Sequence, residues 1–269
     1  MDIPRYLYHY TSVESLALIL RNRTFRLNPL DRMDDLQEKE TKDLKGLGSF
    51  CYVSSWTDDP SEQIPMWKMY TDPKAGVRIR LKTLPFKTYP LTQEHIDKYL
   101  NHISRTAIPS DIYVDFDQLV RKSYFAMNWA KSLLLKKVEY TDESSKLYPQ
   151  LLQTIDNDYV ISLNELGKYK NTHWEFQSEW RYSMVIIPFE FSCNENKQQI
   201  IQVMAKMMKG ILKPAVSYFD LQIDEQAFAD MEITLSPQIT CGNELIVKTL
   251  VEKYNPKASV TTSSLLGLI

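Results

Sequence analysis

The sequence predicts an α+β protein with a mixed β-sheet core and flanking helices. Three observations support this class. Residues 5–27 and residues 231–262 each show the order strand, helix, strand. Residues 76–81 alternate apolar and polar side chains with the two-residue period of a strand. Residues 174–185 show the same period and continue into an apolar run. We expect the chain to form a single domain, residues 1–269.

The first elements follow from local patterns. Residues 5–11 alternate aromatic and polar side chains and predict a strand. Ser12 has the position of a helix N-cap, and the helix is expected to end near Arg23. Its apolar face would consist of Val13, Leu16, Ile19 and Leu20. A short strand is expected at residues 24–27. The acidic residues 28–45 predict a loop and a helix that faces solvent.

The next segment combines a strand with a short aromatic helix. Residues 50–56 predict the strand. After a turn, the helix is expected to begin at Ser61 or Pro65, because proline is well tolerated in the first helical turn. Trp67 and Tyr70 are three residues apart and therefore share one face of this helix.

The middle of the chain predicts a helical insertion at about residues 84–170. Residues 115–136 have the apolar spacing of a long helix. A strand is expected at residues 137–140. Residues 145–168 are expected to be mostly helical, with Pro149 marking a helix start rather than an interior position.

The late segment at residues 174–185 carries an unusual set of polar side chains. If it is extended, one face holds Glu175, Gln177, Glu179 and Arg181. The other face holds Phe176, Trp180 and Tyr182. Because burial of several charged groups is costly, we expect the polar face to line a wet cleft. The alternative is an edge strand whose charges simply face solvent.

Composition and missing motifs exclude several classes of function. The formal net charge of −2 gives no global attraction for nucleic acid or an anionic membrane, so no strong nucleic-acid signal is present. No apolar run approaches the ~20 residues that span a bilayer, and no signal peptide is evident, so a cytoplasmic location without membrane contact is expected. The sequence has three widely spaced cysteines and no CxxC or HExxH pattern, so no metal site is indicated. Neither a dinucleotide fingerprint, a phosphate-binding loop nor a GxSxG turn occurs.

The polar residues suit the stabilisation of a sugar cation. When a bond to an anomeric carbon breaks, positive charge spreads over C1 and the ring oxygen, and a carboxylate bound to the neighbouring hydroxyl stabilises it. An aromatic platform would hold a planar leaving base, and a guanidinium or histidine would hold a phosphate or ribose. Residues of these types are Glu179, Gln177, Trp67, Tyr70, His9 and Arg181. For His9, the alternative is a partly buried ring satisfied by a backbone carbonyl.

Several short sequence motifs occur one after another along nearly the whole chain. They are YHYTS at 8–12, MDDLQE at 33–38, MWKMY at 66–70 with GV at 76–77, WE at 174–175 with SEWR at 178–181, and SSL at 263–265. This order resembles a widespread bacterial family, the domain-of-unknown-function family 2971. The second motif departs from the family's NDPxE pattern by two substitutions and one extra residue.

The layout further resembles the ADP-ribosyltransferase fold, and Gln177-Ser178-Glu179 is similar to the QxE variant of its late signature. The resemblance implies a split mixed sheet that binds NAD, as a substrate, in a cleft. Glu179 would polarise the ribose hydroxyl and stabilise the cation, and Gln177 would orient the acceptor. Further NAD contacts are implied for His9, Tyr10, Thr11, Ser12, Trp67, Tyr70 and Arg181. The spaced tyrosines that would sandwich nicotinamide are not identifiable.

The resemblance thus implies an NAD-dependent ADP-ribosyltransferase that modifies a macromolecular acceptor of unknown type. Such an activity suits a toxin or an anti-phage defence effector, with a neutralising partner protein as one further implied partner. The alternative function belongs to another class. It is a non-catalytic module that binds a nucleotide or a partner protein in the same cleft, with the polar strand as a recognition surface.

Overall fold

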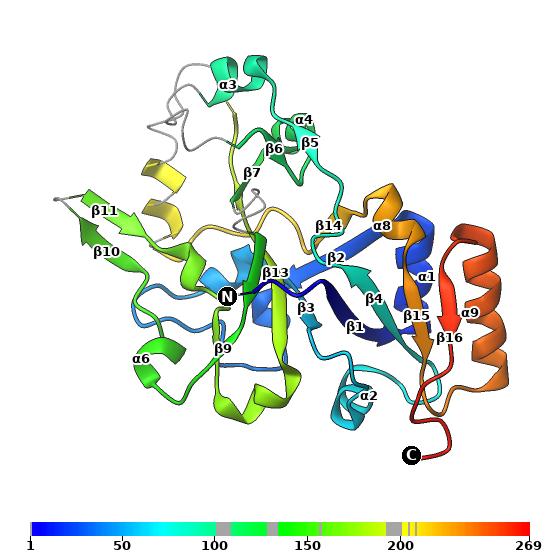
Figure 1. Cartoon of the computed structure of the whole chain (residues 1–269). Coiled ribbons are helices and arrows are strands. Elements are labelled where there is room, and N and C mark those ends of the chain that lie inside the picture. The colour runs from blue at the N-terminus through cyan, green and yellow to red at the C-terminus, as the bar shows by residue number, and fades with distance from the viewer. Residues whose placement is uncertain are drawn as a thin grey trace.

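The computed structural model describes residues 2–100, 109–127, 134–155, 158–191, 201–203, 205–207 and 209–269. Within these ranges the chain forms a mixed α+β structure around one ten-stranded sheet (Figure 1). Seven strands follow one another in the order β14 (Phe219–Gln222), β2 (Thr24–Pro29), β3 (Cys51–Thr57), β1 (Tyr6–Ser12), β4 (Gly76–Lys82), β15 (Glu232–Leu235) and β16 (Ser259–Thr261). In this series only β15 and β16 are parallel to each other. The expected α+β class is confirmed at this level.

The ten strands form one sheet, but two different strands share one edge of β3, and this leaves a split between β1 and β2. On one edge of β3, β13 (Glu179–Pro188) pairs along the whole strand. The other edge is shared between two strands, because β2 pairs at Tyr52 and Val53 whereas β1 pairs only at Thr57. Residues 54–56 have no ladder partner on this edge among the described residues. The strands β1 and β2 therefore diverge here, and the backbone of β3 is left open between them.

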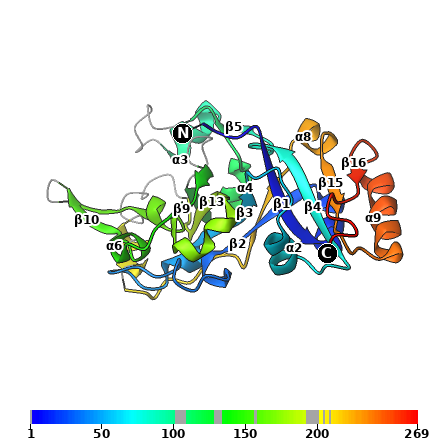
Figure 2. The same cartoon turned by 60° about the horizontal axis from the view of Figure 1, so that its bottom comes forward.

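Helices at the two chain ends pack together beside the sheet. Ser12 caps α1 (Val13–Asn22), as predicted, and α1 lies against α9 (Cys241–Tyr254) next to β15 and β16 (Figure 1). The strand–helix–strand order predicted for both ends of the chain is confirmed. The short α8 (Glu225–Ala229) precedes β15. The predicted aromatic helix is α2 (Ile64–Tyr70), which contacts β1 and lies at its end (Figure 2).

Residues 115–136 do not form the long helix that their apolar spacing predicts. Helix α4 (Phe116–Arg121) is short, and Ser123 follows it in a left-handed conformation with a φ of 53°. The chain continues as β7 (Tyr124–Met127) and, after six residues outside the described part, as β8 (Leu135–Lys137). Both strands pair with the edge of β13 that faces away from β3. The prediction was wrong because pairing with a buried strand overrides a local helical period.

The predicted helix at residues 145–168 is also wrong. Helix α6 (Ser144–Leu147) ends before Pro149, and a hairpin of β10 (Leu152–Ile155) and β11 (Asp158–Ile161) follows. The other short elements of this region are β5 (Tyr89–Pro90), α3 (Gln93–Tyr99), β6 (Asp111–Ile112), β9 (Glu139–Tyr140), η4 (Leu163–Glu165) and β12 (Tyr169–Lys170). The described part of residues 84–170 is therefore a mixture of short helices and strands, not a helical insertion.

The acidic segment at residues 28–45 contains no α-helix. It begins in β2 and continues through a 3₁₀ turn, η1 (Leu30–Arg32), and a second turn, η2 (Leu47–Phe50), follows it. Asp35 and Glu38 are both 5% exposed, so the prediction of a solvated helix was wrong. The segment folds inward because one of its carboxylates finds a buried partner, described below.

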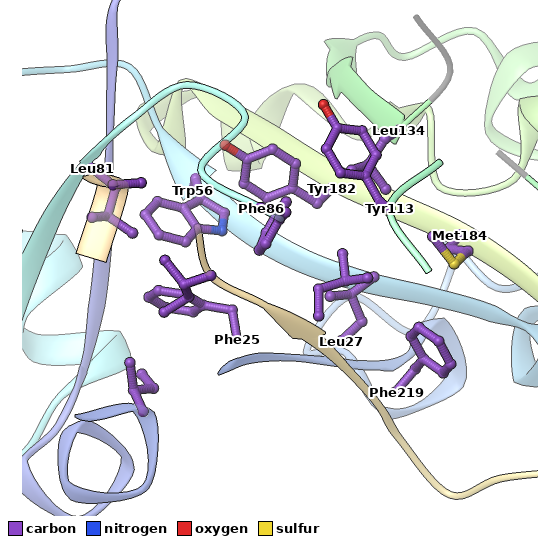
Figure 3. Packing of buried hydrophobic residues seen from close by; sticks show 14 of the residues in the cluster. Phe25, Leu27, Trp56, Leu81, Phe86, Tyr113, Leu134, Tyr182, Met184 and Phe219 are labelled. Atoms are coloured by element: carbon purple, nitrogen blue, oxygen red, sulfur yellow. The ribbon is translucent and has the colours of Figure 1, made fainter. Parts of the chain in front are cut away.

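An aromatic cluster supports the split in the sheet (Figure 3). The ring of Trp56 lies 4.7 Å from that of Phe25 and 5.7 Å from that of Tyr182, measured between ring centres. Phe86 packs edge-on against Tyr182 at 4.7 Å. Trp56 also lies 5.0 Å from the ring of His9. The core therefore fixes the orientation of this histidine where β1 separates from β3.

Candidate functional site

A cleft lies at the split in the sheet. Its inner part is a pocket of about 110 Å³, lined by residues of β1, β3, α2, the acidic segment and the start of β13. An outer cavity of about 390 Å³ adjoins it. The two share His9, Tyr10, Met33, Asp34, Ser55 and Tyr70. The cleft thus brings together several predicted site residues that lie far apart in the sequence.

His9 is held in one tautomer by the open edge of β3. Its Nδ1 lies 2.8 Å from the carbonyl oxygen of Ser55. Because a carbonyl oxygen only accepts hydrogen bonds, Nδ1 carries the hydrogen and Nε2 is left as an acceptor. Burial lowers the pKa of His9, and the hydrogen bond to Ser55 opposes this only in part, so the ring is neutral. The predicted bond to a backbone carbonyl is present, and the ring lines the cleft as well.

The segment that was expected to be one strand changes conformation in its middle. Residues Thr172–Gln177 form a 3₁₀ turn, η5, and Ser178 has a positive φ of 44° before β13 begins at Glu179. Glu175 is therefore exposed, whereas Gln177 and Glu179 are each 3% exposed. The prediction of four polar side chains on one strand face was wrong. Side-chain capping of the turn by Asn171, which accepts from the His173 N–H, stabilises the turn locally.

Glu179 is the centre of a buried ion-pair network. Arg181 donates to it twice, with Nε 2.5 Å from Oε1 and Nη2 3.1 Å from Oε2. The Nζ of Lys170 lies 2.9 Å from Oε2. Burial alone would raise the pKa of Glu179, but attraction by Arg181 and Lys170 and hydrogen bonds from Arg181 and Ser55 lower it to about 2. The charged face is thus buried rather than wet, which corrects the prediction.

A second carboxylate shares the same guanidinium. The Nη1 of Arg181 lies 2.6 Å from Oε2 of Glu38 and 3.1 Å from the carbonyl oxygen of Gly167. Gly167 has a φ of 64°, and a Cβ there would lie 3.2 Å from Leu30, so glycine lets the chain approach this closely. Burial raises the pKa of Glu38, and attraction by Arg181 offsets this only in part.

Gln177 connects the network to the cleft. Its Oε1 accepts from Lys170 Nζ at 2.9 Å, and its Nε2 donates to the hydroxyl oxygen of Tyr70. Burial raises the pKa of Tyr70, so its hydroxyl stays protonated. Tyr70 lines both parts of the cleft. It is therefore the aromatic ring of α2 that a bound ligand can reach.

Trp67 does not line the cleft, so its predicted stacking role is wrong. The residue is 1% exposed and packs edge-on against Tyr10 at 4.9 Å. Its Nε1 donates to Glu62 Oε2 at 3.0 Å. The helix begins at Ile64, and this register turns the tryptophan toward the core while Tyr70 stays half-buried.

Arg181 is also 1% exposed, and it forms ion pairs with the carboxylates of Glu38 and Glu179. It is therefore not available to a phosphate.

The remaining predicted residues divide between the cleft and the fold. Tyr10 lines both parts of the cleft, and Thr11 lines the outer part. Ser12 lines neither part. Its Oγ accepts from the Ser15 N–H at 3.1 Å, so it serves the helix rather than a ligand.

Replacing Ser12 by alanine is expected to lower the free energy of unfolding by about 1 kcal/mol, because α1 loses its N-cap. Urea denaturation followed by circular dichroism measures this change. Ser12→Asn retains a capping side chain and is expected to keep nearly all of the stability. Equal stability of Ser12→Ala and the natural chain would contradict the capping role.

Three residues that matter here were not predicted. Lys170 and Glu38 complete the charge network, and Ser55 supplies the carbonyl that orients His9. Lys170 lies on a two-residue strand without a sequence motif, and Glu38 sits among charged neighbours that resemble a solvated surface. Ser55 has a small polar side chain within an apolar strand, which was the one local signal.

In the described part of the chain, no three His, Cys, Asp or Glu side chains come together as a metal site. The described helices are all too short or too polar to cross a membrane. Comparison of the chain with family models, with curated proteins and with solved structures gave no match in any of the three.

Proposed function

We propose that the chain is an ADP-ribosyltransferase-like protein, related to the domain-of-unknown-function family 2971, that binds NAD in the cleft and transfers ADP-ribose to a macromolecule. The observation that carries the proposal is the split at β3, where a neutral histidine, a tyrosine ring and an ionised glutamate line one pocket. A toxin or anti-phage defence role, with a neutralising partner protein, belongs to the same proposal.

Glu179 would stabilise the ribosyl cation that forms as nicotinamide leaves. A carboxylate does this only when it is ionised, and the network keeps the pKa of Glu179 at about 2. A ribose hydroxyl would take the place of the Ser55 hydroxyl, which now hydrogen-bonds to the carboxylate. Gln177 lies beside it and would orient the acceptor.

The other side chains of the cleft would hold the rest of NAD. The Nε2 lone pair of His9 would accept a hydrogen bond from a ribose hydroxyl, and the ring of Tyr70 would stack on nicotinamide. Arg32 lines the outer cavity and would supply the positive charge for the pyrophosphate that Arg181 cannot supply, whereas Arg26 is paired with Asp220. Tyr10 and Thr11 would contact the adenosine side.

Nicotinamide release from NAD tests the proposal. The natural protein is expected to release nicotinamide, and Glu179→Gln to release it at least about 10²-fold more slowly, as when a preorganised electrostatic group is lost. Glu175→Gln is the matched control, because Glu175 is exposed and lies outside the cleft. Equal release by natural protein and Glu179→Gln, with both folded, would refute the role of Glu179.

One observation favours a second function, a non-catalytic module that binds a nucleotide in the same cleft. The carboxylate of Glu179 already accepts hydrogen bonds from Arg181 on both oxygens and from Lys170, which leaves little capacity for a substrate. NAD binding to the purified chain, measured by calorimetry, would favour this module if no nicotinamide is released in a separate assay to which cell extract is added as a source of acceptors. Release that depends on Glu179 would exclude it.

A further inference from the structure

A larger cavity, of about 690 Å³, adjoins the outer cleft and shares Thr24 and Asp220 with it. It forms where the start of β2, the segment before β14, α4 and the start of β7 meet. Its volume lies within the roughly 300–1,000 Å³ of small-molecule sites. Tyr113 lines it, and the hydroxyl of this residue is buried without a hydrogen-bond partner among the described residues. This hydroxyl lies behind the cavity surface, so the contacts with a ligand must come from the accessible side chains of the wall.

Among the described residues, the charged groups of this cavity are one ion pair, one carboxylate and one ammonium. Asp220 accepts two hydrogen bonds from Arg26, at 2.9 and 3.1 Å. Asp115 caps α4 and accepts from the Asp117 N–H at 3.0 Å. Lys122 is exposed at the rim and makes no ion pair within the described ranges. A ligand would therefore meet one ion pair, the carboxylate of Asp115 and the free ammonium of Lys122, so that the ammonium can pair with a phosphate and the carboxylate can accept from sugar hydroxyls.

The walls offer aromatic rings and amides. Tyr89 is partly buried and Tyr218 is 43% exposed, while the guanidinium of Arg26 covers Tyr218 at 3.4 Å from the ring centre. The side chains of Gln118 and Gln222 make no hydrogen bond to the described part of the protein. Each amide supplies donors and an acceptor, as recognition of sugar hydroxyls or of a base edge requires.

We infer that this cavity is a second ligand site, which binds a nucleoside 5′-monophosphate. The base would pack against Tyr89 and against the face of Tyr218 opposite Arg26, the two glutamines would hydrogen-bond to the sugar or the base edge, and Lys122 would pair with the phosphate. A sugar phosphate shares the phosphate and hydroxyl chemistry, but it has no planar ring for the tyrosine walls. The inference is independent of the proposed function, because the cavity can bind whether or not NAD reacts in the cleft.

Isothermal titration of the whole chain with AMP, GMP, CMP, UMP and ribose 5-phosphate tests the inference. At least one mononucleotide is expected to bind with a Kd below about 1 mM. Ribose 5-phosphate is expected to bind at least tenfold more weakly, because it lacks the stacking ring. Lys122→Ala is expected to weaken mononucleotide binding roughly tenfold, as for loss of a charge-assisted contact, and Gln118→Ala to weaken it less. Lys257→Ala, another exposed lysine, is the matched control and should bind like the natural chain.

Three outcomes would overturn the inference. One is the absence of binding by all four mononucleotides at millimolar concentration. Another is equal affinity for ribose 5-phosphate, which would make the cavity a sugar-phosphate site. The third is binding that survives both Lys122→Ala and Gln118→Ala, and its loss in His9→Asn would then place the nucleotide in the cleft. Circular dichroism of each variant confirms that any loss of binding is not a loss of fold.

Discussion

Replacing Glu179 by glutamine is expected to lower the free energy of unfolding by about 3–5 kcal/mol, the usual cost of removing one partner from a buried ion pair. The variant leaves the side chains of Arg181 and Lys170, 1% and 6% exposed, with Glu38 as their only close carboxylate within the described residues. Urea denaturation measures the loss. A cost below about 1 kcal/mol, similar to that of the exposed Glu175→Gln, would show that the network does not bear on stability.

A double variant tests whether the loss of stability in Glu179→Gln comes from the unpaired charge of Lys170. Adding Lys170→Met to Glu179→Gln removes the cation that lost its partner, so part of the stability is expected to return. Lys170→Met alone should destabilise the fold, because Glu179 and Gln177 both lose a donor. Additive losses in the double variant would contradict a coupled network. For the nicotinamide assay, the coupling means that Glu179→Gln must be assayed where circular dichroism shows it to be folded.

The sequence predicted the helices and strands whose signals are local, such as a capping residue or a strict alternation of apolar and polar side chains. Ser12 and the apolar face of α1 predicted the first helix, because both signals are local. The alternation at residues 76–81 predicted β4, which is central in the sheet. Residues 124–127 were assigned to a helix because their strand partner, β13, lies about sixty residues away and leaves no mark on the local period.

The site was predicted by residue type but not by geometry. His9, Tyr70, Gln177 and Glu179 line one pocket, a convergence that the sequence by itself could not show. Their burial was not predicted, because the countercharges come from Glu38 and Lys170, neither of which stands in a recognisable motif. Local sequence shows that a charge exists, whereas the partner that makes its burial tolerable is a product of the tertiary fold.

The same network predicts how stability depends on pH. The pKa of Glu179 falls from its ordinary value of 4.5 to about 2 on folding, so its contribution is present above pH 4.5 and is lost as the pH falls toward 2. The size of the loss is about 3 kcal/mol, from about 1.4 kcal/mol for each pH unit. Glu38 has the opposite sign, because its pKa rises on folding, and its protonation favours the folded state as the pH falls toward 4.5.

Urea denaturation at a series of pH values from 7 to about 2.5 would resolve the two contributions. The natural chain is expected to hold or gain stability down to about pH 4.5 and to lose it steeply below. In Glu179→Gln the steep acid loss should be much reduced, whereas in Glu38→Gln it should remain and the gain above pH 4.5 should vanish. If Glu179→Gln kept the same acid slope as the natural chain, other carboxylates would control acid unfolding, and the ionised state of Glu179, on which its proposed role in the cleft depends, would lose its support.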